Sequence, residues 1–477
     1  MSRKGKNRDN NQITAGPAQL ADQSGVASSN PTRLKRWLTS KVMTALSNEN
    51  KMRAKRDKAE RLRKKNNYRH HVEYFHQLDD PYSHLAIQAL QKLQSQYDID
   101  ISVHLVAGPT GDNLPEPTLL LDYAREDCSQ IAPYYSCQFP THANQPRAAQ
   151  VAIAKQILAR QILAEKDAVT VNNIAKVGVE VGRTVWSDKD LKPLAHQYGY
   201  SSEAETDQLI IKGSELQSRL GHYSGAMFFY GGEWYWGVDR LHYLEQRLTD
   251  LSANTAIEKP FVAPRRTIDI GPIKNNKGLS LAFYPSLRSP YTSIIFDRAV
   301  QMCHDSGVEL VLRPVLPMVM RGVPVTQQKG MYIFFDAARE ARSLGLNWGK
   351  IADPIGDPVR RAYSLFPWAR EQGKESEFFS AFLQAAFFRG INTNRDKGMR
   401  TVVENAGLSW QQAQSIIGNH NWEAEFEANR MAMYQFQSWG VPSFQLLDKN
   451  GQCILGTWGQ DRLWLVAEKI KQQLAAD

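Results

Sequence analysis

The alternation of apolar and polar positions becomes regular near residue 71 and predicts an α/β unit. Strands are predicted over 72–78 and 101–108, with a helix over 82–97 between them that starts just after Asp80-Pro81, since proline is well tolerated in the first helical turn. A mostly helical stretch follows. A β-hairpin is then predicted over 226–237, where a Gly-Gly pair supplies residues that take positive φ at little steric cost. A last helix completes the unit.

The same order of elements recurs in the second half of the chain. Strands are predicted over 281–287 and 308–315, a long helical stretch over 328–438, and a hairpin with a terminal helix from residue 441 onward. Two strands joined by a crossover helix pair in parallel, and a hairpin then adds antiparallel strands. The pattern therefore predicts tandem thioredoxin-like α/β domains, each with a large helical insertion.

Three short segments of the first half reappear in the same order in the second half. Asp-Pro-Tyr-Ser at 80–83 matches Ser-Pro-Tyr-Thr at 289–292. Leu-Asp-Tyr-Ala-Arg-Glu is matched with Phe-Asp-Ala-Ala-Arg-Glu, and Trp-Gly-Val-Asp-Arg-Leu with Trp-Gly-Gln-Asp-Arg-Leu. The predicted divisions are a basic arm at 1–70, a first domain at 71–255, a linker at 256–276 and a second domain at 277–477.

The positive charge of the chain is concentrated in the arm. The formal net charge is +9, but residues 1–70 hold 18 Lys and Arg against 5 Asp and Glu, whereas the remainder holds 40 against 44. Residues 1–32 are polar and are expected to be disordered, and residues 33–66 are helix-prone. Two interpretations stay open. The basic helix attaches to an anionic surface, either nucleic acid or membrane, or it is solvated or docked on its own protein.

The chain has no apolar run of about 18 residues and no apolar leader, so neither a membrane span nor export is predicted and a cytoplasmic location is expected. Its cysteines contain no C-x-x-C pair and no zinc-ligand spacing. Unpaired thiols and no metal site are therefore expected. The cysteines are Cys128, Cys137, Cys303 and Cys453.

A thioredoxin arrangement places the N-terminus of its first helix at the carboxyl edge of the sheet. The unpaired amides and the dipole at that helix end favour a thiolate or another anion. In the second half, Ser289 occupies this position. Its hydroxyl is a candidate donor to a thiolate, and the alternative is that Ser289 only caps the helix.

The second half resembles a known group of enzymes over residues 280–470. The Ser-Pro-Tyr segment, the Val-Pro-Ser-Phe segment and the Trp-Gly-x-Asp-Arg-Leu ending are similar to those of the 2-hydroxychromene-2-carboxylate isomerase and kappa-class glutathione transferase group within the DsbA-like proteins. The helical insertion, including QQKGMYIFFDAAREARSLGL, is similar as well.

The resemblance implies a glutathione site. Ser289 would stabilise the glutathione thiolate, and Val441, before a cis Pro442, would pair its backbone with the cysteinyl part. Asp461 would bind the γ-glutamyl amine, and Lys329 would bind a carboxylate of glutathione or of the substrate. The alternatives are that Asp461 only caps the last helix and that Lys329 is a solvated surface residue. The glutathione-contacting Asn of the group has no counterpart, because Met320 and Arg321 stand near its place.

The first half departs from this pattern at three positions. Asp80 stands where Ser289 stands, Ala226 replaces the cis proline, and Pro115 takes the place of the lysine. These changes indicate a lost site on a retained fold. A new site that uses Asp80, His76 or His104 is the alternative.

The resulting hypothesis is a glutathione-dependent isomerase or transferase that acts on an electrophilic, unsaturated carbonyl compound through the second domain. A non-catalytic thioredoxin-like scaffold is the second hypothesis. A disulfide oxidoreductase is the third and weakest, because the active cysteine pair is absent. The sequence leaves the oligomeric state open.

Overall fold

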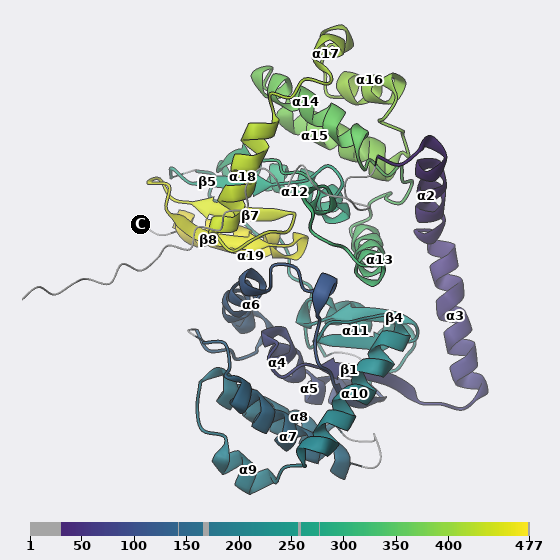
Figure 1. Cartoon of the computed structure of the whole chain (residues 1–477), viewed down its shortest axis with the longest axis vertical. Helices are drawn as coiled ribbons and strands as arrows, with labels where there is room; N and C mark the ends of the chain where they lie inside the picture. Colours follow the sequence, from purple (N-terminus) through teal and green to yellow (C-terminus); the bar gives the residue numbers. More distant parts are fainter. Residues whose placement is uncertain (1–29, 142, 166–170, 256–258, 276, 476–477) are drawn as a thin grey trace, which may run out of the picture.

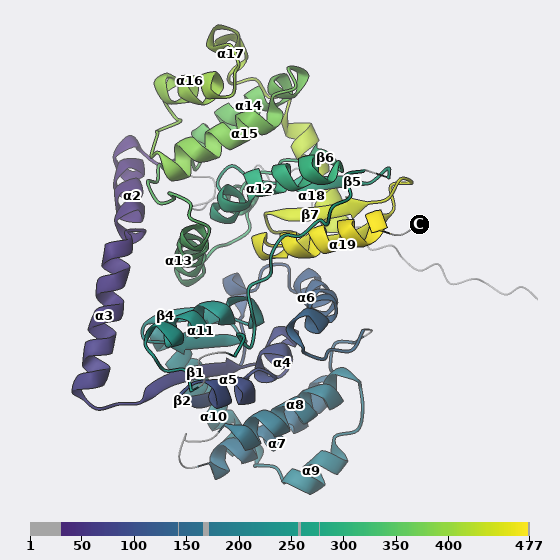
Figure 2. The ribbon, with the colours of Figure 1, turned by 180° about the vertical axis from the view of Figure 1, so that it is seen from behind.

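The computed structural model describes residues 30–141, 143–165, 171–255, 259–275 and 277–475, and Figures 1 and 2 show them from opposite sides. The disorder predicted for residues 1–29 therefore lies outside the described residues. None of the described helices is long and apolar enough to span a bilayer.

The first half contains a four-stranded sheet with the order β2-β1-β3-β4. β1 pairs in parallel with β2, with Val72 opposite Ile101, and antiparallel with β3. The Gly-Gly pair joins β3 to β4 with φ values of 52° and 86°, as the predicted hairpin requires. The strands are β1 His70–His76, β2 Ile99–Leu105, β3 Met227–Tyr230 and β4 Glu233–Trp236.

The second half contains a separate sheet of the same topology, β6-β5-β7-β8. β5 is again the strand that pairs in parallel with one neighbour and antiparallel with the other. Its strands are β5 Ser280–Tyr284, β6 Glu309–Leu312, β7 Ser443–Leu447 and β8 Cys453–Trp458. The repeated order of elements predicted from the sequence thus appears as two sheets with equivalent strand order.

Helices cover both sheets, and the insertions form helical caps at opposite ends of the molecule (Figure 1). The helices of the first half are α4 Pro81–Ile87, α5 Leu90–Gln96, α6 Pro117–Ile131, α7 Ala148–Ala164, α8 Asn172–Trp186, α9 Lys192–Tyr198, α10 Glu203–Leu220 and α11 Leu241–Asp250. Those of the second half are α12 Pro290–Ser306, α13 Gln327–Ser343, α14 Asp357–Glu371, α15 Glu375–Leu383, α16 Asp396–Asn405, α17 Trp410–Ile416, α18 Glu423–Gln435 and α19 Leu463–Ala475.

Two helices of the arm run along one side of the molecule and touch both halves (Figure 1). They are α2 Arg33–Leu46 and α3 Glu49–Lys65. Arg36 of α2 donates to the carbonyls of Asp353 and Ile355 in the second half, at 3.2 and 2.5 Å. Arg56 of α3 pairs with Glu233 in the first half at 2.6 Å. In this structure the arm is docked on its own protein.

Candidate functional site

Ser289 lies beside the residue that precedes the cis proline. As the N-cap of α12 it accepts a hydrogen bond from the Thr292 amide at 3.1 Å, and its Oγ donates to the Val441 carbonyl at 3.4 Å. The Val441–Pro442 peptide bond is cis. Three of the predicted site residues therefore meet where α12 begins and β7 starts.

This corner has the physical features of an anion site. The first amides of a helix lack intrahelical partners, and the helix dipole adds partial positive charge there. The Ser289 oxygen accepts a hydrogen bond from one of these amides, so Ser289 does cap α12, as the alternative interpretation expected. Its proton makes only a long contact to Val441, at 3.4 Å. That proton can turn to a ligand sulfur at little cost.

Arg321 is a buried cation at the same corner. It is 7% exposed, and it donates from Nε to the Leu316 carbonyl at 2.9 Å and from Nη2 to the Trp439 carbonyl at 2.8 Å. Its third nitrogen, Nη1, is buried without a hydrogen-bond partner among the described residues. Burial lowers the pKa of Arg321. The sequence showed Arg321 only as a residue near the missing asparagine, so it was not predicted as a ligand.

Lys329 lies in the first turn of α13 and is half-buried. Burial lowers its pKa from 10.5 to about 8. Its ammonium forms no ion pair with the described residues. This lysine thus differs from the fully solvated surface residue that was the alternative.

Asp461 is engaged by the other half of the chain. Its Oδ2 accepts from Arg240 at 2.7 Å, and Arg462 donates in return to Asp239 at 2.9 Å. Burial by itself raises the pKa of Asp461, but the charges of Arg240 and Arg462 outweigh this effect and hold the pKa below its usual value. Asp461 lies in the short 3-10 helix Gln460–Arg462 before α19, and its carboxylate pairs with Arg240 and, at 3.9 Å, with Arg462.

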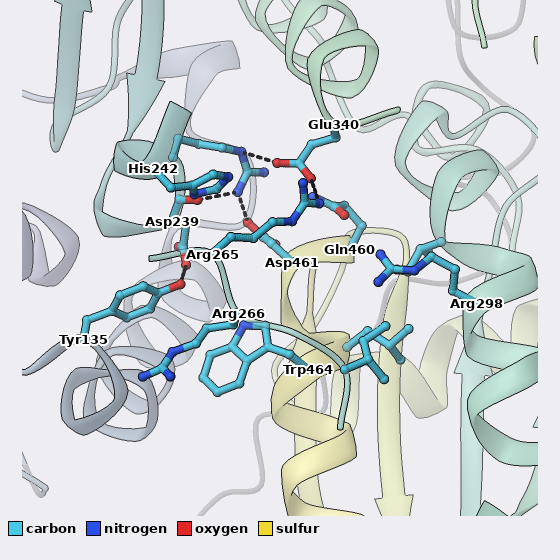
Figure 3. A pocket seen from close by; sticks show the side chains of 14 residues that line it. Tyr135, Asp239, His242, Arg265, Arg266, Arg298, Glu340, Gln460, Asp461 and Trp464 are labelled. Atoms are coloured by element: carbon cyan, nitrogen blue, oxygen red, sulfur yellow. Dashed lines mark hydrogen bonds and ion pairs between the residues drawn. The ribbon is translucent and has the colours of Figure 1, made fainter. Parts of the chain in front are cut away.

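Figure 3 shows this contact between the halves from close by, with Asp461 near Arg265, Glu340 and Gln460. Arg265, from the predicted linker region, pairs with Glu340 at 2.8 Å. The groups enclose a cavity of about 40 Å³. This cavity is small because the paired side chains occupy most of the volume between the two halves.

The same arginines also bind one deeper carboxylate each. Arg240 pairs with Asp336 of α13 at 2.9 Å, and Arg462 pairs with Asp127 of α6 at 2.7 Å. All four side chains are almost fully buried. The two halves therefore face each other through two equivalent sets of ion pairs.

Tyrosines at the first helices confirm which carboxylates are equivalent. Tyr82 donates to Asp127 at 2.8 Å, and Tyr291 donates to Asp336 at 2.9 Å. Asp127 is thus the counterpart of Asp336. The match of Leu-Asp-Tyr-Ala-Arg-Glu with Phe-Asp-Ala-Ala-Arg-Glu was wrong by five positions, because both segments carry similar residues at helical spacing. In the corrected register the counterpart of Lys329 is Leu120, not Pro115.

The first half lacks the corner found in the second half. Ala226, immediately before β3, has φ 57° and no cis bond, and its carbonyl accepts from Gly237 at 2.8 Å just as Pro442 accepts from Gly459 at 2.9 Å. Asp80 stands in the place of Ser289 and accepts from the amide and the hydroxyl of Ser83, at 2.9 and 2.7 Å.

The candidates for a new site in the first half each have an internal partner. Burial raises the pKa of Asp80 to about 6 and lowers that of His76 to about 3. His76 contacts the Tyr74 hydroxyl at 3.0 Å, and His104 contacts Glu73 at 2.6 Å. The Tyr74 hydroxyl also donates to the Ser83 carbonyl, so it connects His76 with the residue that binds Asp80, whereas His104 pairs with Glu73.

All four cysteines are free thiols, as expected. Burial raises the pKa of Cys303 and of Cys137, the latter to about 11. Neither thiol is suited to be a nucleophile near neutral pH.

Comparison with known proteins gives a family model and several solved structures. Residues 280–471 match the model of the DSBA-like thioredoxin domain. A probable DsbA oxidoreductase from Streptomyces coelicolor is 20% identical over 41% of this chain and 88% of its own, with a TM-score of 0.31. A 2-hydroxychromene-2-carboxylate isomerase is 18% identical over 40% and 95%, with a TM-score of 0.34.

A putative protein disulfide isomerase from Nitrosomonas europaea is 10% identical over 42% of this chain and 99% of its own, with a TM-score of 0.33. No curated protein matches the chain. Residues 280–471, the part of the chain that matches the model of the DSBA-like thioredoxin domain, contain the sheet β6-β5-β7-β8.

Proposed function

We propose that the chain is a glutathione-dependent isomerase or transferase that acts on an electrophilic small molecule at the Ser289 corner. The observation that carries the proposal is the approach of Ser289 Oγ to the Val441 carbonyl, 3.4 Å away, at the start of α12. A thiol placed there would meet a hydroxyl donor, the helix dipole and the strand backbone at Val441. We propose the cytoplasm as the compartment, where glutathione is the thiol pool.

The chemistry follows from the thiol pKa. Donation from Ser289 and the dipole of α12 would lower the pKa of a bound thiol and raise its thiolate fraction. The thiolate would add to an unsaturated carbonyl compound by forming a carbon–sulfur bond, and the electron pair would move to the carbonyl oxygen. A transferase would protonate and release the adduct. An isomerase would expel the thiolate again after rotation about the former double bond.

Two cations are available for the carboxylates of the tripeptide. Arg321 offers a buried Nη1 without a partner, and Lys329 offers a half-buried ammonium. Asp461 would bind the γ-glutamyl amine through Oδ1 while Oδ2 stays with Arg240. The role of the missing asparagine thus passes to Arg321 in this proposal.

Titration calorimetry with glutathione tests the proposal, together with the ultraviolet absorbance of the bound thiolate against pH. Asp461→Ala is expected to weaken binding by about five- to a hundredfold, since losing a charged partner costs about 1–3 kcal/mol. Ser289→Ala is expected to retain most of the affinity but to raise the pKa of the bound thiol. Ser409→Ala is the matched control, because Ser409 caps α17 in the same way.

A non-catalytic binding protein is the second candidate, and the observation that favours it is the pairing of Asp461 with Arg240. If the wild-type chain does not bind glutathione at millimolar concentration, the enzyme proposal is wrong and this candidate replaces it. A disulfide oxidoreductase has no support at this corner, because serine cannot form a mixed disulfide.

A further inference from the structure

A cavity of about 630 Å³ lies between the arm and the two halves of the molecule. Its walls come from α3, from the β3–β4 hairpin of the first half and from α13 of the second half. Sites that bury most of a small molecule have volumes of about 300–1,000 Å³. The cavity is therefore large enough for a ligand, and it lies apart from Ser289, Val441 and Pro442, none of which lines it.

The inner wall of the cavity is apolar. Met52 and Leu62 of α3 face Trp234 of the hairpin and Met331 and Phe335 of α13 across it. Leu62 is 51% exposed and Phe335 is 40% exposed, although both are large apolar side chains. Apolar surface left open in a concave site favours an apolar ligand, because its burial removes that surface from water.

Cations dominate the ionisable groups at the same cavity. Both carboxylates that line it are neutralised by arginines: Glu233 by Arg56 at 2.6 Å, and Asp336 by Arg240 at 2.9 Å. By contrast, four lining cations form no ion pair with the described residues. They are Lys51, Lys55, Lys58 and Arg342.

Two polar groups in the wall are also unused. The Tyr332 hydroxyl and Arg339 Nε are buried without a hydrogen-bond partner among the described residues, and Arg339 is 8% exposed. Buried polar groups are nearly always paired in folded proteins. Both residues belong to the lining, but these two atoms are themselves fully buried, so the groups that a ligand in the cavity meets are the apolar side chains and the lining cations.

We propose that this cavity binds a single-chain anionic amphiphile of the fatty-acid class, with its chain between α3 and α13 and its carboxylate at the lysines of α3. Three successive turns of α3 present these lysines, at positions 51, 55 and 58. The ligand would bridge the arm and both halves. The arm is thereby part of a binding site and not only a docked helix.

Calorimetric titration of the full chain with decanoate and dodecanoate, below their micelle concentrations, tests the proposal. Each buried methylene strengthens binding by up to about fourfold, so dodecanoate is expected to bind up to about fifteenfold more tightly than decanoate. Dodecyltrimethylammonium has the same chain with the opposite charge and is expected to bind at least about tenfold more weakly than dodecanoate.

Variants locate the site. Lys55→Glu is expected to weaken dodecanoate binding by about tenfold. Arg61→Glu is the matched control on the same helix, because Arg61 is exposed and does not line the cavity. Met331→Trp fills part of the cavity and is expected to abolish binding of dodecanoate. Circular dichroism checks that each variant is folded.

Three results would overturn the proposal. They are absence of dodecanoate binding by the folded full chain, equal affinity for the ammonium amphiphile, and unchanged affinity in both Lys55→Glu and Met331→Trp. The last result would assign binding to another apolar surface.

Discussion

Arg240 and Asp461 connect the two halves of the chain, 2.7 Å apart, and the same two positions of the repeated Asp-Arg motif are joined the other way round by Arg462 and Asp239. Each arginine therefore serves the half to which it does not belong. The Asp-Arg motif that was matched between the halves in the sequence thus forms two reciprocal ion pairs between them, Arg240–Asp461 and Arg462–Asp239, which are called the interdomain lock below.

Removing one arginine of this lock is expected to destabilise the whole chain. Arg462→Ala leaves Asp127 and Asp239 buried without their cation, and breaking a buried pair in this way costs about 3–5 kcal/mol. Denaturant unfolding measures the loss. Lys374→Ala breaks the exposed pair with Glu377 and is expected to cost less than about 1 kcal/mol. Equal effects of the two variants would contradict the interdomain lock.

Glu245 gives the stability a pH dependence of known sign. It is fully buried, it accepts from the amides of Val262 and Ala263 at 2.7 and 3.1 Å, and burial raises its pKa from 4.5 to about 7. The folded chain keeps this proton where the unfolded chain has lost it. Its contribution is therefore complete below about pH 4 and is lost as the pH rises through about 7.

Glu245→Gln keeps an acceptor oxygen and cannot titrate. The stability of the wild type relative to this variant is expected to fall by about 3 kcal/mol between about pH 4 and about pH 8. Unfolding free energies across this range provide the measurement. A difference that stays constant with pH would show that burial does not raise the pKa of Glu245 in the folded chain.

Lys329 is expected to react with amine-acylating reagents at lower pH than the lysines of the arm. Its pKa of about 8 leaves about half of its amine unprotonated at pH 8, whereas a solvated lysine ordinarily has a pKa near 10.4. Mass spectrometry of acylated peptides against pH measures the profile. A profile for Lys329 that coincides with those of exposed lysines would contradict the effect of burial.

Two helical glycines are expected to respond in opposite ways to alanine. A Cβ at Gly213 of α10 would stand 2.1 Å from the Leu105 carbonyl oxygen, so Gly213→Ala is expected to cost about 1–3 kcal/mol. At Gly330 of α13 the nearest atom is Val325 Cγ1 at 3.6 Å, so Gly330→Ala is expected to stabilise by about 0.5–1 kcal/mol. Thermal or denaturant unfolding measures the change in stability of both variants. Changes of the same sign would contradict the packing of α10 on β2.

The strand order of both sheets could be predicted because it follows from short sequence patterns, namely the alternation of apolar residues in the strands and the residues of the hairpin turn. Alternation marked the ends of these strands to within about three residues, and the Gly-Gly turn fixed the first hairpin. The helix predicted over 82–97 is instead divided at Gln88–Ala89, where the sequence pattern is continuous. Such a break is set by packing against neighbouring elements and not by local propensity.

The candidate site could be predicted only in part. Ser289 was placed at a helix start from a local sequence signal, whereas Val441 and the cis Pro442 came from the family resemblance of the Val-Pro-Ser-Phe segment, and the structure brings the three residues together. The partner of Asp461 was missed, because Arg240 lies 221 positions away and no local pattern joins them. Arg321 was not singled out as a candidate for a related reason, since its unpaired nitrogen appears only once the surrounding carbonyls are placed.

The reciprocal lock has a consequence for chain continuity. Each half supplies an arginine to the other, and the peptide between them adds contacts with both halves, through Val262 and Ala263 to Glu245 and through Arg265 to Glu340. The unbroken chain adds to these contacts by raising the effective concentration of one half near the other. A chain cleaved between residues 256 and 258 is therefore expected to migrate as one particle under native conditions and to separate into two fragments only in denaturant.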